Sequence, residues 1–202
     1  VKELFFSRFI IAYRAVETYR DILDHVPDHA ATLTALERMI AQGREAVAAA
    51  SVLEPIYRAA GDSARLAQVL EVLIEHEEDP NRKVELLHQV AEIYEVHLDE
   101  PQRAFEALAR AFPVDSQHDA TLAALERLAE KLGAFSRLTE LYDAGIARLK
   151  DTAAETTVDL ALRAAQLFEV QLGDVNAAIV RYQVVTEIDP THIAALEELD
   201  RL

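Results

Sequence analysis

One predicted helical face gathers three glutamates and a histidine. Its residues are Glu85, His88, Glu92 and Glu95, at relative positions i, i+3, i+7 and i+10. An imidazole and a carboxylate one turn apart can bind a metal ion or exchange protons. The sequence provides neither the HExxH spacing nor a third ligand beside them, and spacing alone is weak evidence for a metal. We therefore expect no metal here and treat the four side chains as a candidate binding face.

A second histidine-containing group lies at a predicted junction between helices. It consists of Asp24, His25, Asp28 and His29. His29 belongs to a wider pattern, because His118 and His192 precede two later helices at equivalent positions. A histidine that recurs at the start of several related helices indicates a role in the turn rather than a single metal site. We therefore predict a structural role for these histidines.

The residue types that most enzymes need are missing or isolated. Cysteine is absent, which excludes thiolate nucleophiles, disulfides and cysteine-ligated zinc or iron–sulfur sites. The sequence contains no glycine-rich phosphate loop and no GxSxG motif, and no serine lies near a histidine in a suggestive context. Carboxylates are abundant, but none stands out by a partner base or a surrounding loop. We expect no catalytic residues, no metal and no cofactor.

The balance of charge limits the kinds of partner. Acidic residues outnumber basic ones by 36 to 20, and the net charge is −16. Such a surface repels phosphate backbones and anionic lipid, so we expect no nucleic-acid and no membrane partner. No apolar run is long enough to span a bilayer. The charge favours a protein or peptide partner with a basic surface that exposes lysine or arginine.

Helical periodicity covers nearly the whole chain and no strand pattern occurs. The predicted helices are 3–24, 29–42, 45–60, 63–77, 81–98, 101–112, 119–132, 135–150, 155–172, 175–187 and 191–202. Glycines stand where four of them should end, and prolines stand at the first position of two others. Pro55 is the exception, because it lies inside a helix and should kink it. Every connection is short, so consecutive helices must pack as antiparallel neighbours.

Related sequence motifs recur along the chain. The first set is ATLTALERM at 31–39, ATLAALERL at 120–128 and IAALEEL at 193–199, and a longer pair is AEIYEVHLDEPQRA at 91–104 and AQLFEVQLGDVNAA at 165–178. The repeating unit is about seventy residues with four helices, a length typical of stacked helix pairs. Small residues at Ala91, Ala104, Ala165 and Ala178 should let these helices approach closely. One such pair cannot bury its own apolar face, so each pair depends on its neighbours.

These residues resemble the tetratricopeptide repeat (TPR) family. The best match carries Ala165, Phe168, Gly173, Ala178, Tyr182 and the pair Asp189-Pro190, and looser matches cover most of 45–202. The sequence departs from the family in lacking tryptophan, in its longer and more variable units, and in a half-unit spacing of 18 residues from Met39 to Tyr57. The resemblance implies a right-handed α-solenoid of antiparallel helix pairs that binds other proteins.

The resemblance also extends the candidate face, because in this family one stripe of each first helix lines a concave groove. By alignment the same stripe carries Glu126 and Glu130 in the next unit, and Asp159, Gln166 and Glu169 in the one after. The groove would then be acidic and could seat a basic or amphipathic peptide. The alternative is an ordinary solvated face of an acidic protein. Family members that bind a partner's C-terminal carboxylate use basic residues on this stripe. Because the stripe here is mostly acidic, we expect that it does not bind a partner in this way.

Both ends of the chain carry apolar residues beyond the regular repeats. Residues 4–11 (LFFSRFII) could dock a partner or a second copy, or could cover the end of the helical core. At the other end Leu196, Leu199 and Leu202 stand on what should be a packing face. The first residue is valine and the last helix stops short of its relative at 122–133. We therefore expect a piece of a longer protein that could self-associate through open solenoid ends.

The sequence as a whole predicts an all-α, TPR-like solenoid of about eleven helices in one domain. Irregular helices would occupy 1–44, helix pairs 45–80, 81–118, 119–154 and 155–190, and a truncated repeat 191–202. The predicted function is a non-catalytic scaffold that binds a peptide or protein in the acidic groove, in the cytoplasm of a bacterium by family habit. Two alternatives remain: a structural spacer or oligomerisation segment, and a regulatory sensor arm of an enzyme or transcription factor.

Overall fold

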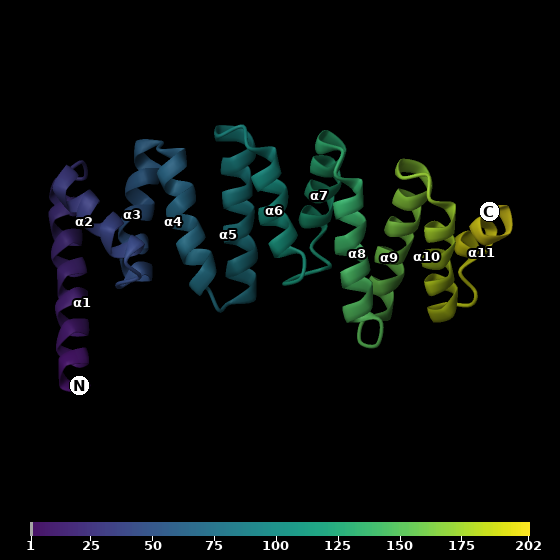
Figure 1. Ribbon diagram of the computed structural model, residues 1–202, viewed down its shortest axis with the longest axis horizontal. Helices are drawn as coiled ribbons and strands as arrows, with labels where there is room; N and C mark the ends of the chain where they lie inside the picture. The colour runs from purple at the N-terminus through teal and green to yellow at the C-terminus, as the bar shows by residue number, and fades with distance from the viewer. Residues whose placement is uncertain (1) are drawn as a thin grey trace. The chain divides into compact units, whose positions relative to one another are not determined.

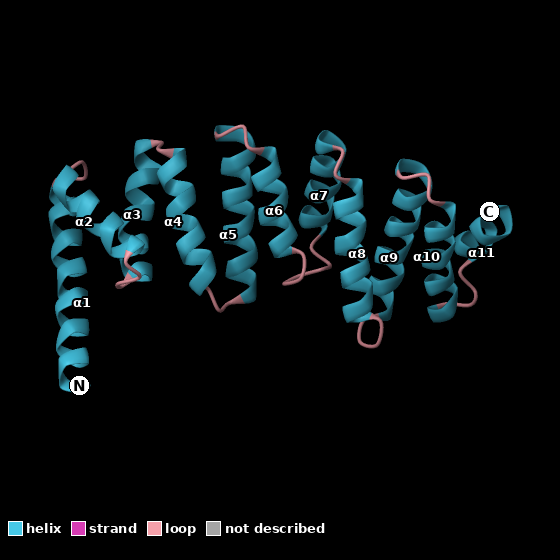
Figure 2. Cartoon of the chain, in the orientation of Figure 1, coloured by secondary structure: helices cyan, strands magenta, loops and turns pink. Residues whose placement is uncertain are grey.

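The computed structural model describes the backbone of residues 2–202 and the side chains of residues 13–202. The chain forms two compact units, unit 1 at Val1–Glu100 and unit 2 at Pro101–Leu202. Helices joined by short turns make up both units, and no strand occurs in residues 2–202 (Figure 2). The all-helical prediction is confirmed. No helix in the described part of the chain is long and apolar enough to cross a membrane.

Unit 1 contains five α-helices and a final π-helical turn. They are α1 (Lys2–His25), α2 (Ala30–Ala41), α3 (Ala46–Ala60), α4 (Ser63–His76), α5 (Pro80–Glu92) and η1 (Ile93–His97). Each helix packs on the next along the chain, and α1 also contacts α3. The turns between them are short, so α3, α4 and α5 run alternately up and down (Figure 1). The side chains of the predicted apolar stretch 4–11 lie outside the described residues.

Unit 2 contains six α-helices with a π-helical turn after the fourth. They are α6 (Pro101–Ala111), α7 (Asp119–Leu132), α8 (Phe135–Leu149), α9 (Ala154–Gln166), η2 (Leu167–Gln171), α10 (Val175–Ile188) and α11 (Ile193–Arg201). Consecutive helices again pack on one another as antiparallel neighbours (Figure 1). The ends of all the predicted helices are confirmed to within two residues. The predicted boundaries of the helix pairs stay a prediction. Along the chain, the boundary between the two units falls inside the predicted pair 81–118.

The recurrent histidines cap helices, as predicted. Nδ1 of His29, His118 and His192 accepts the N–H of the residue three positions later, at 3.3, 3.2 and 3.2 Å. An N-terminal N–H has no partner inside its helix, so a side-chain acceptor at the N-cap stabilises the first turn. Because the backbone donates to Nδ1, this nitrogen carries no proton, and the imidazole proton is on Nε2.

The histidine caps also correct the predicted alignment of α11. Counted from its cap, LEELDRL at 196–202 lies in register with LAALERL at 122–128 and LTALERM at 33–39. Matching IAALEEL to AALERL by letters alone gives a register that differs from this one by three residues, close to one helical turn. Asp200 is then the equivalent of Glu126 and Glu37. A three-residue slip preserves the spacing of alanines and leucines on a helix, which is why the sequence match alone did not reveal it.

Two equivalent helices end in the same π-helical turn, which the sequence did not predict. In η1 the N–H of Leu98 bonds to Ile93 O at 3.1 Å, and in η2 the N–H of Leu172 bonds to Leu167 O at 3.1 Å. The next residue adopts a left-handed conformation in both, with φ of 53° at Asp99 and 66° at Gly173. The bond from residue i+5 to residue i widens the last turn. The chain thus reverses direction in the same way at both places.

Alanines and leucines fill the core between the helices. Ala91, Ala104, Ala165 and Ala178, predicted to allow close approach, are all buried. Gly145 serves the same purpose in unit 2, because a Cβ atom there would lie 2.9 Å from Cζ of Phe112. Helix α3 continues through Pro55, which is exposed and so keeps its missing N–H on the solvent side.

Candidate functional site

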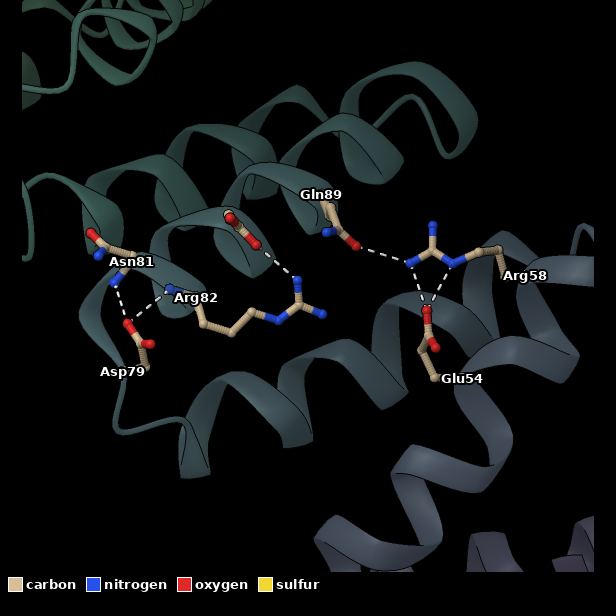
Figure 3. Close-up of polar contacts among 7 residues, drawn as sticks. Glu54, Arg58, Asp79, Asn81, Arg82 and Gln89 are labelled. Atoms are coloured by element: carbon tan, nitrogen blue, oxygen red, sulfur yellow. Dashed lines mark hydrogen bonds and ion pairs between the residues drawn. The ribbon is translucent and has the colours of Figure 1, made fainter.

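The unit 1 part of the predicted stripe lies on α5 and η1. Asp79 caps α5, since its Oδ1 accepts the N–H groups of Asn81 at 2.9 Å and Arg82 at 3.3 Å (Figure 3). Pro80 occupies the first helical position, where no donor is needed. Along this helix and the turn that follows it, Glu85 and Glu92 are exposed, and His88 and Glu95 are half-buried.

One arginine neutralises part of the stripe in unit 1, and a second joins the stripe's helix to α3. Glu85 forms an ion pair with Arg82 at 2.8 Å. Arg58 extends from α3 and donates both to Glu54 at 2.7 Å and to Gln89 on α5 at 2.9 Å, so it joins two helices that are not consecutive (Figure 3). Glu92 has no hydrogen bond or ion pair with any described residue. It is therefore a free negative charge of the stripe in unit 1.

In unit 2 the predicted stripe residues lie on three elements. Glu126 and Glu130 are on α7, Asp159 and Gln166 on α9, and Glu169 on η2. Arg163 of α9 pairs with Glu126 at 2.7 Å and with Asp159 at 2.8 Å. Two of the predicted binding carboxylates thus hold one arginine between them. Glu130 and Gln166 are exposed without a partner in the described part of the chain.

A recurring Glu–Tyr–Arg cluster explains why some of these carboxylates already accept hydrogen bonds from other helices. In each cluster a glutamate on one helix accepts a tyrosine hydroxyl from the next helix and an arginine from the helix after that. The sets are Glu37, Tyr57 and Arg65; Glu126, Tyr142 and Arg163; and Glu169, Tyr182 and Arg201. The tyrosine–glutamate distances are 2.6, 2.9 and 3.4 Å. Three successive helices are therefore tied together through one carboxylate.

The same contacts change the titration of the tyrosines. Burial raises the pKa of Tyr57, Tyr142 and Tyr182 above the ordinary value, and the adjacent glutamates raise it further. A tyrosine kept neutral in this way remains a hydrogen-bond donor. Ion pairs between exposed charges contribute little to stability, but a buried hydroxyl that bonds to a carboxylate contributes more. The clusters are thus structural contacts between helices.

The sequence prediction of the stripe did not include this structural role of its carboxylates. Glu37 was not among the predicted site residues, although it lies in the motif LTALERM, which matches the motif that contains Glu126. The recurrence of a glutamate followed by a buried tyrosine was the available signal. The arginines had no such signal, because Arg163 and Glu126 are 37 positions apart and meet only through packing.

A hollow in unit 1 was not predicted from the sequence. It has a volume of about 680 Å³ and lies between the end of α1 and the outer side of α3. Its floor is apolar and is formed by Leu23, Leu33, Val52, Pro55 and Ile56. Ligand sites commonly have volumes of about 300–1,000 Å³. The hollow is therefore large enough for one or two side chains of a bound peptide.

Negative charge predominates among the free groups on the rim of this hollow. Arg20 is already paired with Glu17 at 3.0 Å, and Arg65 is already paired with Asp62 at 3.5 Å. Asp24 and Asp28 also line the hollow, and neither has a polar partner among the described residues. An apolar side chain with a basic neighbour would complement such a rim.

The described residues do not gather the side chains that a metal ion would need. Within residues 13–202 no three histidine, aspartate or glutamate side chains are grouped so that they could hold a metal ion. The predicted group of Asp24, His25, Asp28 and His29 is divided by its contacts, because His25 faces the carbonyl of Asp21 at 2.8 Å and His29 caps α2. The carboxylates of the clusters already accept hydrogen bonds and offer no free base.

The solved structures that are similar to this chain include those of MamA and YrrB. No protein-family model matches the sequence, and no curated protein matches it. The crystal structure of MamA is similar with 19% identity and a TM-score of 0.38, covering 71% of this chain and 78% of that one. The crystal structure of YrrB, described as a TPR protein with an unusual peptide-binding site, has 15% identity and a TM-score of 0.38, covering 91% and 89%. The order and pairing of the helices, with alanines buried between them, make each unit an all-helical array of antiparallel neighbours.

Proposed function

We propose that this chain is a non-catalytic scaffold that binds a peptide segment of a partner protein in the unit 1 hollow. The observation that carries the proposal is the apolar floor between α1 and α3, with two unpaired aspartates on its rim. A preformed site of this kind requires little ordering of the protein on binding. The proposed ligand carries a leucine or phenylalanine that enters the hollow and a lysine or arginine that meets Asp24 or Asp28.

The acidic stripe predicted from the sequence is the second proposed contact. Its free charges in unit 1 centre on Glu92, because Glu85 is paired with Arg82. A basic segment of the partner would be attracted to this face, and such attraction raises association rates more than final affinity. The contribution of the stripe should therefore weaken strongly in high salt, whereas the contribution of the apolar floor should not.

The test is a binding screen with three families of short immobilised peptides. One family combines leucine or phenylalanine with lysine, the second contains lysine without large apolar residues, and the third combines leucine or phenylalanine with glutamate. The full chain is compared with Ile56→Lys, which places a charge on the floor, and with the double variant Asp24→Lys, Asp28→Lys. Circular dichroism verifies that each variant folds.

A matched control separates the hollow from general electrostatics. The double variant Glu75→Lys, Glu78→Lys changes the charge equally at exposed carboxylates that have no polar partner among the described residues. We expect the apolar–basic peptides to bind, and binding to fall by about tenfold or more, or 1.4 kcal/mol, in both hollow variants but not in the control. If the double variant Asp24→Lys, Asp28→Lys and the control lost binding equally, the loss would come from the changed net charge of the chain and not from the hollow. Binding that is lost only on Glu85→Lys, Glu92→Lys would assign the site to the stripe instead.

A further inference from the structure

A second, smaller pocket lies beside the hollow in unit 1. It has a volume of about 170 Å³ and is lined by residues of α2, α3 and α4. Its walls are mainly apolar and come from Ile40, Ala41, Leu53 and Val69. A cavity of about 150 Å³ is enough for a group of the size of benzene. The pocket can therefore take one apolar side chain of ordinary size.

Tyr57 and Arg65 line both the hollow and the pocket, so these two side chains form the partition between them. The guanidinium of Arg65 lies over the Tyr57 ring, 5.7 Å from its centroid. Its ion pairs with Glu37 and Asp62 are 3.4 and 3.5 Å long, whereas a charge-assisted hydrogen bond is about 2.7–2.9 Å long. The Arg65 side chain is 55% exposed, and exposed ion pairs contribute little to stability. The partition therefore ends at the surface in a side chain that a ligand can turn aside.

Helix α2 leads from the hollow to the pocket along one side. Leu33 lines the hollow, and Ile40, seven positions later, lines the pocket. This spacing places both residues on the same side of the helix, about 10 Å apart along its axis. Asp28 stands on the rim of the hollow, just before the start of α2. A negative charge, the apolar hollow and the pocket thus follow one another along α2.

One polar side chain at the pocket is free to bind a ligand. Gln68 of α4 lines the pocket, is exposed, and forms no hydrogen bond with any described residue. A side-chain amide has both donor and acceptor atoms, so it can pair with the N–H and the C=O of a peptide backbone. The pocket therefore combines apolar walls for a side chain with a polar group for the chain that carries it.

We propose that the pocket is a second subsite for the peptide that the hollow binds, and that it takes a second leucine of that peptide. The peptide runs along α2 with its basic residue at Asp28 and its first leucine in the hollow, crosses Arg65, and bonds to Gln68 at the pocket. An extended chain covers about 10 Å with three residues, so the two leucines are two to four residues apart. This inference rests on the function proposed above and adds to it a second apolar side chain in a fixed order.

The test measures the binding of labelled peptides to the full chain by fluorescence anisotropy. The single-anchor peptide carries one lysine and one leucine in a background of glycine and serine. The two-anchor peptides carry a second leucine two, three or four residues beyond the first, on the side away from the lysine and in both sequence directions. The key variants are Ile40→Lys, which puts a charge in the pocket, and Ala41→Phe, which fills it from an exposed position. The matched controls are Met39→Lys and Gln42→Phe, since Met39 and Gln42 line neither the hollow nor the pocket.

We expect the second leucine, at one of the three spacings, to tighten binding to the unaltered chain about tenfold, which corresponds to 1.4 kcal/mol. Ile40→Lys and Ala41→Phe should abolish this gain, whereas Met39→Lys and Gln42→Phe should keep it. Each key variant should bind the single-anchor peptide as well as its control does, because the hollow is unchanged. Circular dichroism verifies that all four variants fold.

Two results would overturn this inference and leave the function of the hollow intact. In the first, the single-anchor peptide binds and loses affinity on Ile56→Lys, but a second leucine adds nothing at any spacing. In the second, the gain from the second leucine persists in Ile40→Lys and Ala41→Phe, which would place both leucines in the hollow. If neither kind of peptide binds the unaltered chain, the function proposed for the hollow is wrong, and the second subsite is wrong with it.

Discussion

The hydroxyl of Tyr142 on α8 donates to the carboxylate of Glu126 on α7 across 2.9 Å, and Arg163 of α9 binds the same carboxylate at 2.7 Å. Tyr142 is fully buried, whereas the Glu126 side chain is 38% exposed. The carboxylate therefore lies at the edge of the core, where one side faces the tyrosine and the other faces the arginine. This arrangement makes Glu126 the common contact of three helices.

We expect Tyr142→Phe to lower the free energy of unfolding by about 1 kcal/mol, because one buried hydrogen bond to a charged acceptor is lost while the ring stays packed. Glu126→Ala should cost about 2 kcal/mol, since it removes the acceptor of both the tyrosine and the arginine. Urea denaturation followed by circular dichroism measures both. Glu130→Ala, which lies one turn away and has no described partner, is the control and should change stability by less than about 0.5 kcal/mol. If Glu130→Ala lowered the free energy of unfolding as much as Glu126→Ala, the loss would come from the changed charge of the helix and not from the broken cluster.

The tyrosines predict how stability depends on alkaline pH. The pKa of Tyr57, Tyr142 and Tyr182 is raised by burial and by the adjacent glutamates, so the folded state keeps protons that the unfolded state loses. Their contribution is fully present below the ordinary tyrosine pKa of about 10 and declines as the pH rises above it, by about 1.4 kcal/mol per pH unit for each such tyrosine.

The measurement is denaturation at a series of pH values, together with a titration followed by tyrosinate absorbance. Tyr57, Tyr142 and Tyr182 should ionise only when the chain unfolds. The Tyr142→Phe variant should show a shallower decline in stability above pH of about 10 than the unaltered chain. Ionisation of all tyrosines near the ordinary pKa, with circular dichroism unchanged, would contradict the clusters.

The histidine cap of α7 gives a third prediction. His118→Ala should lower the free energy of unfolding by about 1 kcal/mol, because the N–H of Thr121 loses its acceptor at the start of the helix. His118→Asn should cost much less, since asparagine is a preferred N-cap and offers an oxygen to the same N–H. Equal losses in the two variants would mean that the imidazole contributes by packing and not by capping.

The helices could be predicted almost completely, because their limits depend on local chemistry. Gly61 and Gly133 end α3 and α7 in a left-handed conformation, and Asp79 and Pro80 begin α5, as their types and positions indicate. The π-helical turns had no comparable signal. Both follow an unbroken helical pattern, and only the change of hydrogen-bond partner from i+4 to i+5 distinguishes them.

The candidate site could be predicted only in part, for a physical reason. The periodicity of α5 and α7 indicates which carboxylates share a face, and the helices that carry Glu85, Glu92 and Glu126 have the predicted limits. Periodicity does not reveal which distant side chain reaches that face. Arg58 meets Gln89, and Arg163 meets Glu126, only because the intervening helix brings the two flanking helices within reach. For the same reason the hollow between α1 and α3, which depends on how these helices cross, had no signal in the sequence.

The repeated π-helical turn supplies the last prediction. Asp99 and Gly173 occupy the same place after η1 and η2, and both have positive φ. A residue with a Cβ atom is strained in this conformation, although aspartate tolerates it better than most. We expect Asp99→Gly to raise the free energy of unfolding by about 0.5 kcal/mol, since relief of strain is partly offset by the greater entropy of glycine in the unfolded chain. Gly173→Ala should lower it by about 1 kcal/mol.

Thermal and urea denaturation of the two single variants and of their combination tests this equivalence. Because the two turns lie in different units, their effects should be additive. Asp99→Ala serves as the control, since it removes the aspartate side chain but keeps the strained Cβ atom. If Asp99→Ala stabilised the chain as much as Asp99→Gly, the aspartate carboxylate and not the backbone conformation would be the source of the strain, and the equivalence of the two turns would not account for it.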